Sequence, residues 1–304
     1  MANSITYATK MTEELDKLFV QSAVTGFLTD NALRAKFVGA HTVLVPDMEL
    51  SGLGNYDRTT GFAEGSVNVS NTAFELTQDR GRSFMLDAQD EDESGVANLA
   101  GQVLGEFVRT KVVPEVDAYC LSKLATMAVN EGQTCALESG ETLENNVLAL
   151  LRRMISNVRN AVGYDEALVA FVDQSVYDAL MATPEIARYV RMDEFKKGEL
   201  NTKVQYIDNV AVLPVPSSRM KTAYTFKDGV SAPEGGFAES GEAQSIGALV
   251  MPKKGASLIR KTEKLRTFSP DQNQKADAYK FDYRLYYDLL VKKSGTAGIY
   301  TYTY

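Results

Sequence analysis

Side chains that could perform acid–base or nucleophilic chemistry are few in this chain, and they are scattered. His41 is the only histidine, so a Ser-His-Asp or Cys-His site would have to use it. The sequence contains no Gly-x-Ser-x-Gly turn, no paired-cysteine or His-Glu-x-x-His zinc motif and no Gly-rich phosphate-binding loop. We therefore expect no catalytic residue, no bound metal and no cofactor.

An acidic run lies at 87–94, directly before a long helical pattern. The order Asp-x-Asp-x-Ser-Gly at 90–95 matches the opening of a calcium-binding loop. The twelfth position of such a loop requires a bidentate glutamate, but here it is Gly101. Carboxylates before a helix also counter the positive end of the helix dipole, and we expect this role for the run.

A second pair of carboxylates, Glu115 and Asp117, follows Pro114. Residues two apart on a helix point to different faces, so the pair cannot flank one substrate as acid and base. We expect both to stabilise the start of a helical segment. A further hypothesis is that they pair with basic groups on a neighbouring subunit.

The elements that would position these residues are too long for a compact globule. An apolar stripe at helical spacing predicts a helix over about 94–129, which would span roughly 55 Å. A spherical domain of this chain length has a radius of gyration of about 19 Å. We expect a kink or restart at Pro114, because a residue before proline, here Val113, is disfavoured in the helical region.

An extended segment from 43 to 86 precedes that helix, and it reads as a bent two-stranded ribbon. Val67 and Val69 share one strand parity, whereas Phe74 and Leu76 share the other, which predicts a bulge or a bend near 70–71. An isolated two-stranded ribbon is marginal in water. Another subunit is therefore expected to cover it.

The rest of the chain carries local signals of ordinary folded structure. We expect a helix over 142–162 that stops at Gly163, a buried strand at 167–172 followed by a helix capped by Asp173, and a hairpin turning at 208–209. Alternating residues predict strands at 278–291 and 299–304.

Composition sets the broad class. The chain has 304 residues, 44% of them hydrophobic and 24% charged, with a net charge of −8. These values exclude global disorder and weigh against a dedicated nucleic-acid or anionic-membrane binder. No window approaches eighteen apolar residues, so no membrane partner is expected. Two cysteines make no disulfide framework, and Cys120 is expected as a buried free thiol in a reducing cytoplasm.

The order of several segments resembles that of the major capsid proteins of tailed bacteriophages. The segments are GLGNYDR at 52–58, DRGRSF at 79–84, VPEVDAY at 113–119, VAVLPVPSSRM at 210–220, YYDLLV at 286–291 and GIY at 298–300. The resemblance implies an α+β, HK-type capsid fold, shared with encapsulin shells. It places an N-terminal arm at 1–37, an extended β-hairpin loop at 38–88, a peripheral domain with a long spine helix at 89–135 and 251–304, and an axial domain at 136–250.

The resemblance also implies function and partners. Such subunits assemble through hexamers and pentamers into an icosahedral shell around double-stranded DNA, so the chain is expected in the virion after assembly in the host cytoplasm. The short arm implies a separate scaffolding protein, and portal and head-completion proteins would be further partners. Nothing marks a Lys–Asn pair for covalent crosslinking. The expected inter-subunit contact residues are Leu53, Tyr56, Arg58, Phe62, Val67, Val69, Phe74, Leu76, Arg80, Arg82, Glu115, Asp117, Tyr300 and Tyr302.

Two alternatives stay open from sequence. One is an encapsulin-like compartment shell with the same fold, which would enclose a protein cargo. The other is a cytosolic hydrolase that would use the acidic run with a divalent metal. A shell predicts particles of megadalton mass, whereas the hydrolase predicts a compact monomer or small oligomer.

Overall fold

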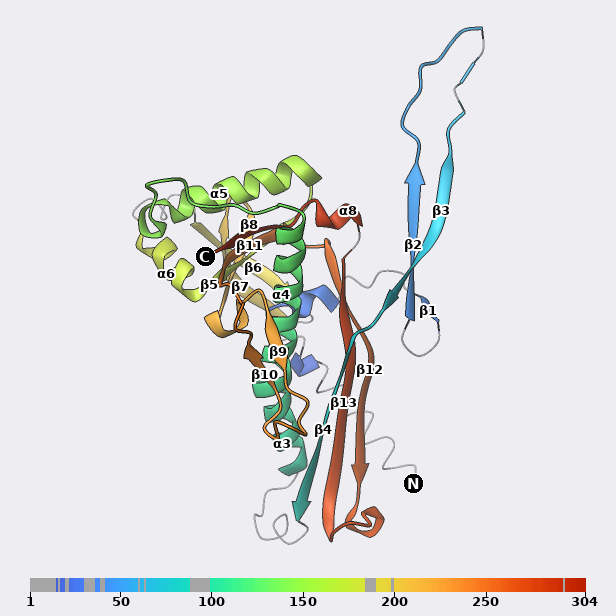
Figure 1. Ribbon diagram of the computed structural model, residues 1–304, viewed down its shortest axis with the longest axis vertical. Coiled ribbons are helices and arrows are strands. Elements are labelled where there is room, and N and C mark those ends of the chain that lie inside the picture. The colour runs from blue at the N-terminus through green and yellow to red at the C-terminus, as the bar shows by residue number, and fades with distance from the viewer. Residues whose placement is uncertain are drawn as a thin grey trace.

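The chain is an α+β protein in which one long helix lies between two larger sheets (Figure 1). A computed structural model describes residues 15, 17–19, 22–29, 36–38, 42–59, 61–62, 64–87, 99–183, 190–197, 200–291 and 293–304. His41 and the acidic positions 90–95 lie outside the described residues, so the calcium-loop pattern is not tested.

The first sheet is built from three long antiparallel strands in the order β12-β13-β4. Their bounds are Ala256–Phe268, Ala278–Val291 and Gln78–Asp87. Alternate residues of β13, among them Tyr283, Leu285 and Tyr287, are buried in the largest core cluster. The strand predicted at 278–291 is therefore confirmed, and β4, although distant in sequence, pairs with it along its whole length.

The long helix is continuous from residue 99 to residue 130, but it is not uniform. An α-helix, α3 (Leu99–Phe107), leads through a π-helical turn, η2 (Val108–Val112), into α4 (Val113–Asn130). The Val113 N–H donates to the Val108 carbonyl, five residues back. The expected restart at Pro114 is confirmed, because a new α-helical segment begins at Val113 with Pro114 in its first turn, although Val113 itself keeps helical φ and ψ values of −57° and −51°. The wider π turn accommodates the proline ring and its missing donor without a break.

The second sheet has six strands in the order β14-β11-β5-β8-β7-β6, and its centre is buried on both faces. In that order the strands are Tyr300–Thr303, Ile246–Pro252, Leu168–Asp173, Val210–Val215, Leu200–Ile207 and Val190–Lys197. Val169 and Phe171 of β5 face the core around the long helix. Ala170 and Val172 face the opposite core, formed with α5 (Leu143–Val162) and α6 (Gln174–Ala182).

Several local predictions about the six-stranded sheet and its helices are confirmed. Gly163 ends α5 with a φ of 92°, and the Asp173 carboxylate accepts a hydrogen bond from the Ser175 N–H at 3.2 Å at the start of α6. The hairpin between β7 and β8 turns at Asp208 and Asn209, with φ values of 48° and 63°. Such positive values suit a tight two-residue hairpin turn.

The last strand, β14, pairs with β11 at one edge of the six-stranded sheet. Its outer side is partly covered, because Thr301 exchanges backbone hydrogen bonds with Gln133 and Cys135. Tyr302 is buried, so this strand serves the chain's own core.

The smaller elements connect these units. A short hairpin of β9 (Tyr224–Phe226) and β10 (Phe237–Glu239) lies between strands β8 and β11 in the chain and runs beside the long helix (Figure 1). The others are η1 (Gly26–Thr29), η3 (Ser217–Arg219), η4 (Pro270–Gln272) and α8 (Lys293–Thr296).

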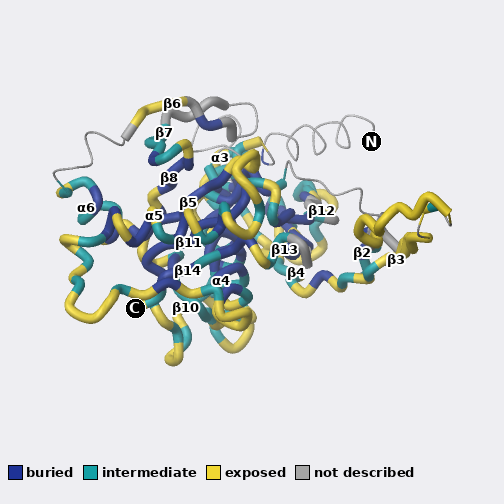
Figure 2. Tube along the Cα trace, turned by 90° about the horizontal axis from the view of Figure 1, so that it is seen from above, coloured by how far each residue is buried: buried dark blue, intermediate teal, exposed yellow. Residues whose placement is uncertain are grey.

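A ribbon projects from the body beyond the start of β4 (Figure 1). It consists of β2 (Thr42–Leu50) and β3 (Val67–Glu75), with β1 (Lys36–Val38) paired at the base of β2. Figure 2 shows the outer part of β3 as exposed and well separated from the buried centre of the molecule. The ribbon expected over 43–86 is confirmed for the strands within 42–75, whereas Gln78–Asp87 pairs with β13 in the body.

Candidate functional site

The two strands of the ribbon keep one register over their whole length. Pairing runs from Thr42 opposite Glu75 to Leu50 opposite Val67 without a shift. Of the bulge or bend predicted near 70–71, the bulge is therefore absent from this ladder, and that alternative is wrong. The change of parity has another origin, because the ribbon buries one face at its base and leaves the other face apolar toward its tip.

The base of the ribbon packs against its own chain. Val43 and Val45 of β2 are 0% and 3% exposed, and Phe74 lies opposite Val43 on the same face. This face contacts a cluster that includes Tyr286 and Leu290 of β13. The base of the ribbon is therefore packed against the body through apolar side chains.

The outer half of the ribbon presents the opposite face to solvent. Leu50 and Val67 are each 66% exposed, and Val69 is 61% exposed. Directly opposite residues share a face, so these three side chains form one strip, which we term the ribbon strip. The other face of the same half carries residues such as Asn68 and Ser70. An amphipathic ribbon whose apolar side has no cover among the described residues is the mark of an interaction surface.

The tip of the ribbon is a small ordered turn with exposed aromatic and apolar residues. Asp57 and Gly61 exchange backbone hydrogen bonds of 3.1 and 2.8 Å. The Tyr56 and Phe62 rings lie 4.8 Å apart, although they are 61% and 86% exposed. Leu53 is fully exposed, and Arg58 is exposed beside them.

Other predicted contact residues lie in the body, within contacts of this chain. Leu76 is 6% exposed and packs in the cluster at the ribbon base. Tyr302 is also 6% exposed, while Tyr300 is half-buried against the core beside α5. The exposed apolar surface thus gathers on the ribbon and not on the last strand.

Arg80 and Arg82 of β4 hold the β9–β10 hairpin against the sheet. The Arg80 guanidinium donates to the carbonyls of Lys227 and Gly236 at 2.8 and 3.1 Å. Arg82 donates to the Pro233 carbonyl at 2.6 Å. Burial alone would lower the pKa of Arg80, but hydrogen bonds and charge from Glu115 outweigh it, and the pKa is raised.

The hypothesis that Glu115 and Asp117 pair with a neighbouring subunit needs correction, because both carboxylates have partners within the chain. Glu115 pairs with Arg80 at 2.6 Å. Asp117, which is fully buried, pairs with Arg219 at 3.0 Å and accepts hydrogen bonds from the Val24 and Thr25 amides. Asp117 thereby fastens the segment before η1 to α4.

Sequence reasoning missed Leu50 as a member of the ribbon strip. The signal was available, since a hairpin centred between Arg58 and Thr59 places Leu50 opposite Val67. It also missed Arg219 and Asp288, whose partners lie about 100 residues or more away in sequence and carry no local mark.

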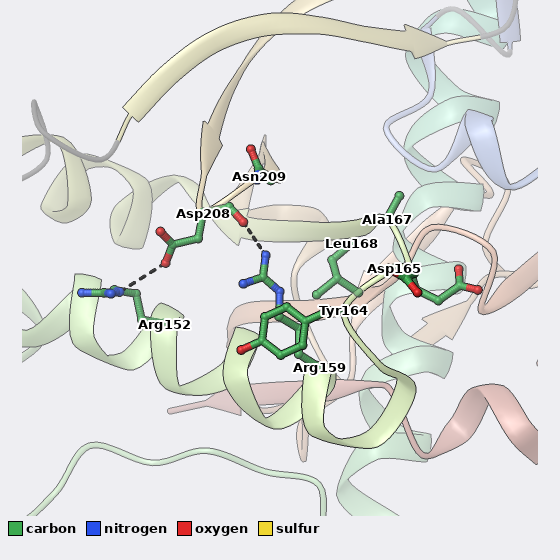
Figure 3. A pocket seen from close by; sticks show the side chains of 9 residues that line it. Arg152, Arg159, Tyr164, Asp165, Ala167, Leu168, Asp208 and Asn209 are labelled. Carbon is green, nitrogen blue, oxygen red and sulfur yellow. Dashed lines mark hydrogen bonds and ion pairs between the residues drawn. The ribbon is translucent and has the colours of Figure 1, made fainter.

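A separate hollow lies where the end of α5 meets the β7–β8 turn (Figure 3). Arg152 Nε lies 3.2 Å from Asp208 Oδ2, and Arg159 donates to the Asp208 carbonyl. The Arg159 guanidinium also stacks 5.1 Å from the centre of the Tyr164 ring. The contacts of Arg152 and Arg159 with Asp208 thus stabilise the β7–β8 turn. Among the described residues there is no cluster of three or more potential metal ligands.

Comparison with solved structures shows which known fold the chain has. No protein-family model matches the chain, and no curated protein matches it by sequence. Among solved structures, the capsid of the cyanophage P-SCSP1u aligns with a TM-score of 0.59 at 12% identity, covering 88% of this chain and 84% of that one. The mature capsid of bacteriophage PhiM1 aligns at 0.54 and 14% identity, covering 87% and 82%.

A third similar structure is a virus-like particle from Pyrococcus furiosus. It aligns with a TM-score of 0.52 at 8% identity and covers 97% of this chain and 99% of that one. The chain therefore has the HK-type capsid fold, and the predicted fold class is confirmed. No helix among the described residues is long and apolar enough to cross a membrane.

Proposed function

We propose that this chain is a structural shell subunit, the major capsid protein of a tailed bacteriophage. The observation that carries the proposal is the ribbon strip, which projects from the body with its apolar side uncovered. The HK-type fold supports the same conclusion. In this proposal the ribbon covers a neighbouring copy, and the subunits close through hexamers and pentamers into an icosahedral shell.

The energetics favour ring closure over an isolated pair. Full burial of Leu50, Val67, Val69, Leu53 and Phe62 would contribute roughly 7–15 kcal/mol in total, taking about 1.5–3 kcal/mol for each side chain. Association of two bodies costs roughly 4–15 kcal/mol before any surplus appears. One ribbon contact is therefore weak. In a closed ring, the ribbon of every copy covers one neighbour, and every copy is covered by the ribbon of another. Closing the ring therefore adds one more contact without adding another subunit.

The proposal assigns the chain no enzymatic role. Its partners would be other copies of itself, a separate scaffolding protein, portal and head-completion proteins, and packaged double-stranded DNA bound without sequence specificity. The net charge of −8 suits that last partner, because an acidic subunit does not adhere tightly to the packaged phosphate backbone. The product would be a virion component assembled in the host cytoplasm.

Electron microscopy of the purified full-length chain tests this function. Closed particles of uniform size and megadalton mass are expected under at least one set of assembly conditions. Small discrete oligomers under every condition, with or without a scaffolding partner, would contradict a shell.

A second candidate is a cellular compartment shell, and the near-complete alignment with the Pyrococcus furiosus particle favours it. Both functions use the same fold, so the contents of the particle distinguish them. Nuclease-protected double-stranded DNA of uniform length supports a capsid. A uniform protein cargo without nucleic acid supports a compartment.

A further inference from the structure

The joint between the ribbon and the body is only two residues long. Pairing of β3 with β2 ends at Glu75, and pairing of β4 with β13 begins at Gln78. Leu76 and Thr77 therefore belong to neither ladder. The direction of the ribbon depends on what holds these two residues.

The polar atoms of the joint are held by two neighbouring residues of β13. The Tyr286 hydroxyl donates to the Leu76 carbonyl at 2.9 Å in a buried contact. Asp288 Oδ2 accepts hydrogen bonds from both the Thr77 N–H and the Thr77 hydroxyl, each at 3.1 Å. Tyr286 and Asp288 lie two apart on the strand and so share its face toward the joint.

Asp288 is in turn fixed by the long helix. Its other oxygen, Oδ1, lies 2.6 Å from Lys123 Nζ and 2.6 Å from the Tyr119 hydroxyl, both on α4. The Asp288 side chain is only 7% exposed, and a carboxylate so buried is stable only with such partners. Burial and the Asp288 hydrogen bond raise the pKa of Tyr119, so its hydroxyl stays a donor.

We propose that Asp288 and Tyr286 are positioning residues that set the angle at which the ribbon leaves the body. Apolar packing at the ribbon base gives attraction without direction, whereas hydrogen bonds to defined atoms restrict orientation. Through Lys123 and Tyr119 the same carboxylate ties that angle to the long helix. The consequence for shell geometry rests on the proposed function, but the positioning itself does not.

The test measures the ribbon in dispersed subunits of the full-length chain. Spin labels on Asn68→Cys and Asn130→Cys report the distance between the ribbon and the end of α4, since the native Cys120 and Cys135 are buried. Tyr286→Phe combined with Thr77→Val removes the Tyr286 hydrogen bond to Leu76 and every hydrogen bond of the Thr77 hydroxyl, which also contacts Tyr119 at 3.0 Å and Gln78 at 3.4 Å, with little change of shape. We expect a clearly broader distance distribution and about tenfold faster hydrogen exchange at the Thr77 and Gln78 amides.

A second variant and a control sharpen the result. Asp288→Asn should broaden the distribution further, and circular dichroism reports whether it folds; if it does not, the Tyr286→Phe and Thr77→Val pair decides alone. Arg284→Gln breaks an exposed ion pair with Asp79 on the same two strands and should change neither readout. Unchanged width and exchange in the double variant would overturn the proposal. Failure of the parent chain to form shells would count against the proposed function only.

Discussion

Arg80 and Glu115 form a two-contact ion pair between β4 and the long helix. The guanidinium Nε lies 2.6 Å from one carboxylate oxygen and Nη2 lies 3.2 Å from the other. The side chains are only 24% and 12% exposed. Because the same guanidinium also holds two carbonyls of the β9–β10 hairpin, one residue joins three separate elements.

Replacing Arg80 should therefore destabilise the subunit. Arg80→Ala leaves the Glu115 carboxylate and two carbonyls without their partner, and we expect the free energy of unfolding to fall by about 2–3 kcal/mol. Urea unfolding followed by circular dichroism measures the loss. Arg109→Ala is the matched control, since Arg109 and Glu106 form an equally direct pair that is 58% exposed on each side. An equal shift in both variants would contradict the account.

Added charge can test which face of the ribbon takes part in the proposed assembly. Val67→Glu with Val69→Glu places two carboxylates on the ribbon strip, so we expect closed shells to disappear while the subunit keeps its thermal midpoint. Asn68→Glu with Ser70→Glu adds the same charge at adjacent positions on the opposite face and should assemble far better. Electron microscopy and size-exclusion chromatography measure both, and shells from the first pair would contradict the assigned face.

Removal of the ribbon tip tests whether it serves the fold or the assembly. The described residues within 54–65 are exposed or partly exposed and pack on no core cluster, so after deletion of this range the chain should stay folded and soluble. Closed shells should not form. Normal assembly of the deleted chain would show that the extended-loop assignment is wrong.

The two free thiols should be unreactive in the native protein. Burial raises the pKa of the Cys120 thiol, the nearby Asp117 charge raises it further, and burial also raises the pKa of Cys135. A disulfide reagent at pH 8 should therefore label both thiols only after unfolding, because it attacks thiolates. Ser70→Cys, on the exposed ribbon, should react at once. Rapid native labelling of Cys120 would contradict its burial.

One carboxylate gives a distinctive pH dependence. The Ser231 hydroxyl and the amides of Val230, Ala232 and Ser231 donate to Asp228 and lower its pKa from 3.8 to about 2. Because the folded pKa is depressed, this stabilisation is fully present above pH 3.8 and is lost as the pH falls toward about 2. Carboxyl chemical shifts measured by NMR should titrate with a midpoint near 2. In Ser231→Ala the midpoint should move up toward 3.8, and an ordinary midpoint in the parent chain would contradict the loop geometry.

The amino-acid sequence alone determined the features that depend on neighbouring residues. The apolar run that becomes β5, the Asp173 cap, the Gly163 stop and the turn at Asp208 and Asn209 are local, because each rests on the φ preferences or hydrogen bonds of a few adjacent residues. The order of segments also predicted the fold. Length and periodicity further indicated a ribbon that a single chain leaves uncovered.

Tertiary structure decided the rest, since the partners are far apart in sequence. Glu115 meets Arg80, 35 positions earlier, and Asp117 meets Arg219, 102 positions later, so neither carboxylate is left for a neighbour. The parity change in β3 reads as a bulge until the register with β2 shows one unbroken ribbon, in which one face is buried at the base and the opposite face is apolar and exposed toward the tip. The helix passes Pro114 because its packing between two sheets outweighs a local preference, and a π turn absorbs the mismatch.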